Sequence, residues 1–430
     1  MMTYRLAGLL RRRMTVLALV AIAYPAGMPA QCAAEGWSAP RSFFPPLTAA
    51  RFGSVVVTRE RIMIAGNRLG RFDNTTVGDS SLAILSSDTT TVGRPAGSFL
   101  FLSPRIAADK SGRLYLFWAE PDSAGPLNRR DVPMAMLRLR SLWYAVYTSQ
   151  TGWTSARLLY TASHRLDWRV EAFADPVVSA NGTVQLVVPG FSETLYIRAA
   201  NGEATAWPIA GFHSTMYAAL QLSGHARLAV AYIAGNFRDG RDETAIYLTT
   251  SADNGRHWSP SRIIFSSELR RPNQVKLLAD PTGDTLYAVW TMLDQARFSV
   301  SGAAIATSSD GGDRWSSPAI AATQAVIRFE AARDGCGTVH VVFDHWGRGA
   351  MHGHLDYMCW HGGWAAPVHL SPTVDALDPK LSTAPDGRTV LTYLGQRPDA
   401  PISEQWSTLW RQLPTVRDAG CSRNDERCLR

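Results

Sequence analysis

The stretch Ser251-Ala252-Asp253-Asn254-Gly255-Arg256-His257-Trp258 decides the fold of this chain, because its pattern, S-x-D-x-G-x-x-W, returns at residues 308–315. The first copy follows a short apolar run, residues 245–250, and leads into another, residues 262–265. This chemistry suits a hairpin turn. The Asp carboxylate can accept hydrogen bonds from backbone N–H groups of its own loop, the Gly allows a positive φ, and the Trp packs as a plug. Two copies 57 residues apart indicate a structural repeat.

Looser copies of this turn extend the repeat over most of the chain. Trp153, Trp207 and Trp364 occupy the same phase as Trp258 and Trp315, and the five tryptophans are 54, 51, 57 and 49 residues apart. That spacing is typical of one four-stranded blade of a β-propeller.

A second hairpin pattern, with apolar residues alternating on both sides of a turn, occurs between these tryptophans. It predicts the two inner strands of each blade. Its seven copies are Ser54–Ala65, Pro104–Trp118, Pro176–Val188, Met216–Tyr232, Val275–Trp290, Ile327–Phe343 and Pro379–Tyr393. We therefore expect an all-β propeller of seven four-stranded blades. Six blades is the alternative if the irregular first hairpin is an insertion.

The two ends of the repeat region complement each other. Trp37 and the residues around it resemble the second half of a repeat turn, so the strand 41–44 lacks a hairpin mate. Residues 404–413 form an expected strand with no repeat turn after it. Pairing these two strands closes the ring and removes the exposed sheet edges. We place the propeller domain at residues 35–416.

The N-terminus has the pattern of an export signal. Arg11, Arg12 and Arg13 precede an apolar stretch, Met14–Ala23, that is too short to span a bilayer, and small residues follow it. Residues 1–34 are therefore expected to be a signal peptide, with an N-terminal anchor helix as the alternative. The mature protein is expected to be periplasmic, secreted or held at the cell surface, without a membrane segment.

Cysteine positions agree with an oxidising compartment. Cleavage after Ala34 leaves four of the five cysteines, whereas cleavage after Ala30 leaves all five. Cys336 begins one expected strand and Cys359 ends the antiparallel strand beside it, which predicts a disulfide between them. In the polar tail, residues 417–430, Cys421 and Cys428 are expected to form a second bridge.

The charge of the chain argues against a nucleic-acid partner. The net charge is +7, but it comes almost wholly from scattered arginines, and no nucleic-acid-binding motif occurs.

A candidate site lies on the face opposite the repeat turns, where the loops between blades surround the channel. Aligning the inner hairpins on their turn glycine gives four cations one shared position: Arg105, Lys276, Arg328 and Lys380. Four cations converging on a channel favour an anionic ligand, such as a carboxylate or phosphate. The alternative is that each cation pairs with a nearby acid: Asp131, Asp175, Glu330 or Asp378.

Histidines are concentrated near the end of the chain, where six of the ten fall between His340 and His369. The pair His352 and His354 would share one face of a strand, but the sequence offers no obvious third ligand. We therefore expect no metal, and no motif indicates another cofactor.

With its repeat turn, known as the Asp-box, the chain resembles the sialidase-like, BNR-repeat propeller proteins over about residues 36–413. This resemblance implies a fold rather than a reaction, because sialidases, other glycosidases and binding proteins share the motif. For a sialidase, it implies an arginine triad holding the substrate carboxylate, an Asp general acid and a Tyr nucleophile.

Carried onto this chain, the resemblance gives Asp131 as the acid and Tyr217 or Tyr393 as the nucleophile. The remaining positions are substrate-binding: Arg105, Arg169, Lys276, Arg328, Glu330 and Lys380. The chain departs from the sialidase pattern in three ways. Its Pro104-Arg105-Ile106 stands in the place of the family's Arg-Ile-Pro element but in a different order, Val188-Pro189 stands where an arginine is expected, and sialidases have six blades.

The sequence thus predicts an exported propeller that binds acidic glycans, with exo-sialidase-like hydrolysis as the expected reaction if it is an enzyme. The alternative hypothesis is a non-catalytic scaffold for a protein partner.

Overall fold

The computed structural model describes 21 segments of the chain. They are residues 37–43, 50–58, 61–68, 82–89, 92–97, 101–121, 139–162, 174–179, 181–188, 194–209, 215–222, 227–234, 245–267, 269–280, 284–294, 299–322, 328–346, 353–370, 375–384, 387–396 and 406–413. The expected signal peptide, the tail and Asp131 and Arg169 lie outside these segments. No helix in the described segments is long and apolar enough to cross a membrane.

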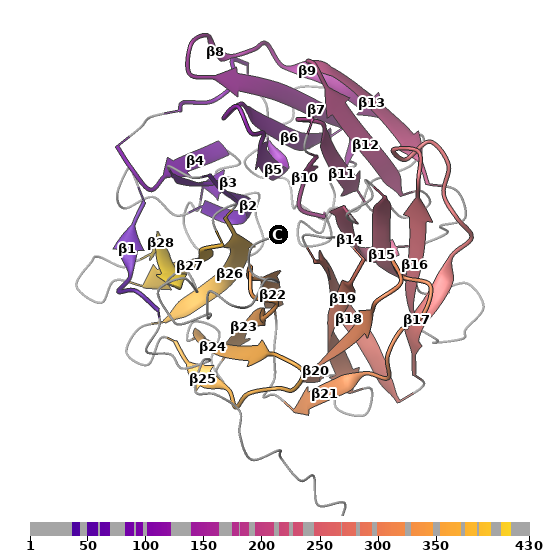
Figure 1. Cartoon of the computed structure of the whole chain (residues 1–430). Helices are drawn as coiled ribbons and strands as arrows, with labels where there is room; N and C mark the ends of the chain where they lie inside the picture. Colours follow the sequence, from indigo (N-terminus) through magenta and orange to yellow (C-terminus); the bar gives the residue numbers. More distant parts are fainter. Residues whose placement is uncertain are drawn as a thin grey trace, which may run out of the picture.

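Seven antiparallel sheets, which we call blades 1 to 7, stand in sequence order around a common centre (Figure 1). The described part of blade 1 has three strands: β2 (Ala50–Val57), β3 (Ile62–Arg68) and β4 (Leu82–Ser86). Blade 2 contains β5 (Leu102–Ala108), β6 (Leu114–Pro121), β7 (Leu139–Thr148), β8 (Gly152–Trp153) and β9 (Arg157–Thr161). Its outermost strand is broken into β8 and β9, which both pair with β7. Blade 3 contains β10 (Val177–Val178), β11 (Val184–Val188), β12 (Leu195–Ala200) and β13 (Glu203–Pro208).

The remaining four blades each have four strands. Blade 4 contains β14 (Thr215–Leu222), β15 (Leu228–Ala234), β16 (Ala245–Ser251) and β17 (Arg262–Ser266). Blade 5 contains β18 (Arg270–Ala279), β19 (Leu286–Asp294), β20 (Ser299–Ser308) and β21 (Ala319–Ala322). Blade 6 contains β22 (Arg328–Arg333), β23 (Val339–Trp346), β24 (Gly353–Trp360) and β25 (Val368–His369). Blade 7 contains β26 (Ala376–Thr383), β27 (Thr389–Gln396), β28 (Trp406–Leu413) and, from the N-terminus, β1 (Arg41–Ser42).

The ring closes as the sequence predicts. Strand β1 pairs antiparallel with β28, with Arg41 opposite Trp410 and Ser42 opposite Leu409. In Figure 1 the indigo β1 lies beside the yellow β28, so segments from opposite ends of the chain complete one blade. The backbone N–H of Ser38 extends this contact by donating to the carbonyl of Gln412 at 2.8 Å.

The hydrophobic core is divided among the junctions between blades. Seven clusters of buried side chains each span two neighbouring blades, and the cluster at the closure joins Phe43 and Trp410 to residues of blade 1 such as Leu85. Second strands such as β19 are buried on both faces, which explains their nearly continuous apolar sequence. Each blade therefore depends on both neighbours for burial.

The two best copies of the repeat turn have one hydrogen-bond pattern. The Asp310 carboxylate accepts from the Ser308 hydroxyl at 2.8 Å and from the Arg314 backbone N–H at 2.8 Å. The Ser308 hydroxyl in turn accepts from the Gly312 N–H at 2.8 Å. Asp253 and Ser251 make the matching bonds in the first copy. The expectation that the Asp binds backbone N–H groups of its own loop is confirmed, and the serine is an equal part of the turn.

Glycine is required in these turns for two reasons. Gly255 has a φ of +83° and Gly312 a φ of +100°, where other residues are strained. A side chain at Gly255 would collide with the Tyr196 ring of the preceding blade. Trp258 packs edge-on against the same Tyr196 ring, at 5.4 Å between centroids. The turn therefore locks neighbouring blades together and belongs to the scaffold.

Cys336 and Cys359 are joined by a disulfide. The bond links the turn before β23 to β24, two strands that are already paired. Cys421 and Cys428 lie outside the described residues.

We expect Ser308→Ala to lower the free energy of unfolding by about 1–3 kcal/mol, because it leaves the buried Gly312 N–H without its acceptor. The measurement is denaturant unfolding of the purified variant. Ser309→Ala is the matched control, since Ser309 is the exposed neighbour in the same turn. Equal stability of the two variants would contradict a structural role for the buried serine.

Candidate functional site: a charged belt in the channel

One residue from each blade forms a ring at a single height in the channel. In blade 2, Ala108 is the last residue of the innermost strand, β5, that pairs with the second strand, β6, and Arg105 lies three residues before Ala108. The same count in the other blades defines what we call the belt: Ser54, Arg105, Asp175, Ala219, Lys276, Glu330 and Lys380. The belt carries three cations and two carboxylates, and its charged members alternate in sign from Arg105 in blade 2 to Lys380 in blade 7.

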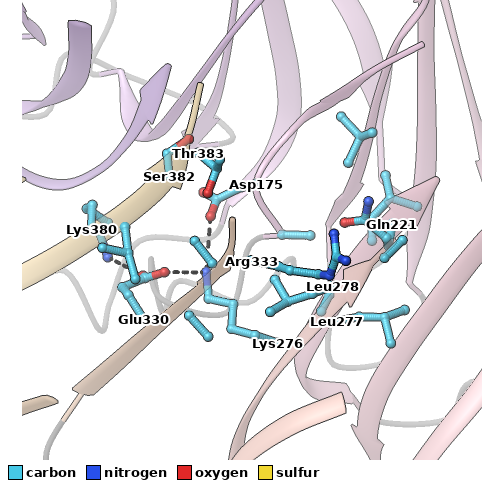
Figure 2. Close-up of a pocket in the computed structure, with 18 of the residues that line it drawn as sticks. Asp175, Gln221, Lys276, Leu277, Leu278, Glu330, Arg333, Lys380, Ser382 and Thr383 are labelled. Atoms are coloured by element: carbon cyan, nitrogen blue, oxygen red, sulfur yellow. Dashed lines mark hydrogen bonds and ion pairs between the residues drawn. The ribbon is translucent and has the colours of Figure 1, made fainter. Parts of the chain in front are cut away.

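Ion pairs connect the charged members into one chain. The Lys276 ammonium lies 3.0 Å from the Asp175 carboxylate and 2.7 Å from that of Glu330. Glu330 also contacts Lys380 at 3.0 Å. The Arg105 guanidinium approaches Asp175 at 3.7 Å. Figure 2 shows the Lys276 side chain pointing between the two carboxylates, with Lys380 on the far side of Glu330.

Ala219 explains why Lys276 can reach Asp175. The two residues belong to blades 5 and 3, and blade 4 between them contributes only a methyl group to the belt. The small side chain leaves room for the long lysine to cross.

Irregular pairing positions several belt side chains. The register between the two innermost strands shifts just before Ser54, Arg105 and Lys380, and two residues before Lys276 in blade 5. Ser103 and Asp378, at the shifts before Arg105 and Lys380, have positive φ. Such bulges bend a strand and redirect its side chains.

A cavity of about 310 Å³ opens at the belt, lined by Asp175, Lys276, Glu330 and Lys380 together with polar groups such as Gln221. The lining groups differ in exposure. The Asp175 side chain is 46% exposed and that of Lys276 24%, whereas Glu330 is 7% exposed. A ligand entering the cavity would therefore meet Asp175 and Lys276 first.

The ion pairs hold the belt in its charged state. Burial alone would raise the pKa of Asp175, but the positive charges of Lys276 and Arg105 outweigh it and hold that pKa below its usual value. Burial would lower the pKa of Lys276, but the charges of Asp175 and Glu330 raise it instead. The stability contributed by Asp175 is thus present above a pH of about 4, and it is lost as the pH falls through the lowered pKa.

A second charged group lies behind the belt in blades 6 and 7. The Arg328 guanidinium is 3.5 Å from the buried Asp378 carboxylate. Asp344 accepts from the backbone N–H groups of Arg328 at 2.7 Å and Asp378 at 3.2 Å. Burial raises the pKa of Asp344. These groups fix the backbone of the two blades, and they are not among the residues that line the cavity.

The structure corrects the expected placement of Arg328. The turn Asp334-Gly335-Cys336-Gly337 contains two glycines, and Gly337 is the one with positive φ. Arg105 precedes the glycine of its own turn by seven residues. The residue seven positions before Gly335 is Arg328, but the residue seven positions before Gly337 is Glu330, which is therefore the true equivalent of Arg105. The partner of Arg328 is accordingly Asp378, and Glu330 pairs with the two lysines instead.

The other expected site residues have different outcomes. Arg105, Lys276 and Lys380 do share one position. Tyr393 packs in the hydrophobic core between blades 6 and 7, where burial raises its pKa to about 12, so it does not face the channel as a nucleophile. The side chain of Tyr217 lies outside what the structure describes, although its backbone places it two residues before the belt position of blade 4.

Asp175 was expected as a pairing acid, and the structure makes it a full belt member. A signal was present in the sequence, because Asp175 precedes Gly182 by seven residues, as Arg105 precedes Gly112 and Lys380 precedes Gly387. The hairpin predicted from the sequence begins at Pro176, one residue after Asp175, and the correspondence was therefore missed.

No protein-family model and no curated protein matches the chain. Among solved structures it is similar to a protein of unknown function from Dyadobacter fermentans, at 16% identity, covering 74% of this chain and 95% of that one, with a TM-score of 0.49. It is also similar to an ulvan lyase, a polysaccharide lyase, at 11% identity, covering 87% and 94%, with a TM-score of 0.49. A Hadza microbial sialidase matches at 13% identity, covering 79% and 73%, with a TM-score of 0.44. These similarities are between backbone folds, and they give no information about the belt residues.

We expect Glu330→Gln to lower the free energy of unfolding by about 1.5–3 kcal/mol, because Lys276 and Lys380, which are only 24% and 12% exposed, lose the carboxylate that they share. The measurement is denaturant unfolding at neutral pH. The control is Asp313→Asn, which breaks a surface pair with Arg262 whose side chains are 52% and 58% exposed and should cost less than about 1 kcal/mol. A loss no larger than that of the control would show that the belt is held by other contacts.

Proposed function

We propose that this protein binds an acidic sugar in the channel, at the cavity formed by the belt. The observation that carries the proposal is the composition of the cavity wall, where two lysines and two carboxylates stand side by side and are connected by ion pairs. The cavity volume, about 310 Å³, is at the lower end of the range for small-molecule sites. It suits one sugar unit rather than a long chain held at full length.

The alternating charges match the chemistry of a sugar ring. A hydroxyl both donates and accepts, so it can donate to Asp175 while it accepts from Lys276. A carboxylate on the sugar would be attracted by the cations that line the cavity, Lys276, Lys380 and Arg333. Charge-assisted hydrogen bonds of this type are the strong ones in a partly buried site.

The described belt supports binding better than hydrolysis. Glycoside hydrolysis needs a carboxylic acid that stays protonated until it protonates the leaving oxygen. The pKa of Asp175 is lowered by its cationic neighbours, which is opposite to the shift required. The expected acid, Asp131, lies outside the described residues, so sialidase-like hydrolysis rests on the sequence resemblance alone.

A second candidate function is favoured by one observation. Each described belt cation has a carboxylate partner, so the belt can serve as a fixed internal network in a scaffold that docks a protein partner. The two functions differ in what Asp175 does. In a sugar site it competes with the ligand for Lys276, whereas in a scaffold it only stabilises the blades.

We also propose that the chain is exported to the periplasm, the medium or the cell surface. The basic and apolar pattern of residues 1–34 supports a signal peptide. The bond between Cys336 and Cys359 is in keeping with an oxidising compartment. N-terminal sequencing of the protein recovered from a secreting host would test the cleavage site.

The binding proposal predicts opposite effects for two belt substitutions. Lys276→Gln should weaken binding of glucuronate or sialate by roughly ten- to hundred-fold, since it removes one charge-assisted hydrogen bond. Asp175→Asn should strengthen binding, because Lys276 is then released to the ligand. Calorimetric titration of each folded variant gives both affinities, and glucose and galactose serve as neutral comparison ligands.

Increasing salt should weaken the binding of acidic sugars in this partly open cavity and leave the neutral sugars unaffected. Asp313→Asn, on a repeat turn, is the control and should bind as the unaltered protein does. Absence of binding by every sugar, with Asp175→Asn changing stability alone, would reject the sugar site and support the scaffold.

A further inference from the structure

A cluster of histidines around one carboxylate lies in blade 6, apart from the belt. His345 in β23 stands directly opposite His354 in β24, and Asp356 stands opposite His369 in β25. Side chains alternate between the two faces of a strand, so His354 and Asp356, two residues apart, share a face. The pairing therefore places four potential metal ligands on one face of three adjacent strands.

The four side chains converge on the carboxylate. The His345 Nε2 atom is 2.9 Å from Asp356 Oδ2, and the His354 Nε2 atom is 4.0 Å from the same oxygen. His369 contacts the other carboxylate oxygen through Nδ1. The His345 and His354 rings are stacked at 4.9 Å between centroids, and the His354 and His369 rings are 5.4 Å apart.

The cluster is buried on its inner side, at His345 and Asp356, and becomes more exposed through His354, at 36%, to His369. The side chains of His345 and Asp356 are 4% and 9% exposed. The His354 Nε2 atom is buried and has no hydrogen-bond partner among the described residues, although it points toward Asp356. His369 is 64% exposed, so an ion could enter from solvent on its side. A buried ring nitrogen without a hydrogen bond is costly unless something binds it.

We propose that His345, His354 and Asp356 bind a zinc ion, with His369 as the fourth ligand. One donor atom from each of the first three residues lies within 4.8 Å of the others. Zinc bonds of about 2.0–2.2 Å in a tetrahedron need donor atoms closer together than this, so the three side chains must move toward the ion on binding, and His369 must move with Asp356, which it contacts. Three imidazoles and one carboxylate suit zinc and disfavour calcium and magnesium, which take oxygen ligands.

The ion would have a structural role. Its ligands come from β23, β24 and the very short outermost strand β25, which has only two residue pairs with β24. A four-ligand site leaves no open position for substrate, as in other structural zinc sites. Zinc would thus fasten the outer edge of blade 6, independently of any ligand in the channel.

The test uses the full mature chain, without an affinity tag, stripped of metal by a chelator and dialysed. We expect one zinc per chain by elemental analysis after reloading, and a higher melting temperature with zinc than with magnesium or calcium. His354→Gln should reduce zinc affinity by at least about ten-fold and remove the thermal shift. The matched control is His361→Ala, an exposed histidine of the same blade, which should retain both properties.

Cobalt substitution tests the fourth ligand. A tetrahedral Co²⁺ site absorbs strongly in the visible range, and His369→Gln should diminish that absorption while the protein stays folded, because His369 is exposed. Asp356→Asn is the stricter ligand variant, but its burial can affect folding, so the two histidine variants carry the test. Zinc binding below one ion per chain, or equal binding by His354→Gln and His361→Ala, would overturn the proposal.

Discussion

The hydrogen bonds between β1 and β28 are the interaction on which the rest of this structure depends. Every blade buries apolar side chains against both neighbours, so a propeller left open would expose the facing sides of blades 1 and 7 together. A short strand from the N-terminus closes the ring, although only two residue pairs join it to β28. Phe43 and Trp410 then pack into the last junction. Closure also fixes the diameter of the channel, and with it the distances between belt residues.

The belt shows how a closed ring can hold charges in its interior. Three cations and two carboxylates come from five blades, and their alternating signs let each charge face an opposite one. Removing charges from water is expensive, and close pairing offsets most of that cost. The arrangement therefore couples blades that are not neighbours in the ring. Lys276 of blade 5, for example, reaches past blade 4 to Asp175 of blade 3. The same groups are those through which the channel can recognise a polar ligand.

Much of the fold could be predicted because it depends on local patterns that repeat. The S-x-D-x-G-x-x-W turns and the alternating hairpins gave the blade number, and the unpaired strands at both ends gave the closure. The site was predicted less well. Lys276, Lys380 and Arg105 were placed correctly from their distance to a turn glycine, but the two glycines of the turn before β23 misplaced Arg328 by two residues. Tyr393 lies in a strand whose apolar residues predict burial of both faces. That pattern does not distinguish a side chain that faces the channel from one that packs in the core between blades.

The sequence by itself determined which segments become strands, where they turn and how many blades they make, because these properties are set by side-chain periodicity and turn chemistry within a few residues. Only the tertiary structure decided which charges meet. Lys276 and Asp175 are 101 residues apart, and His369 reaches Asp356 only because β25 pairs with β24 in one register. Such contacts depend on the curvature of the whole ring and on the register of each sheet. Both are set by packing among all seven blades, and no local pattern records them.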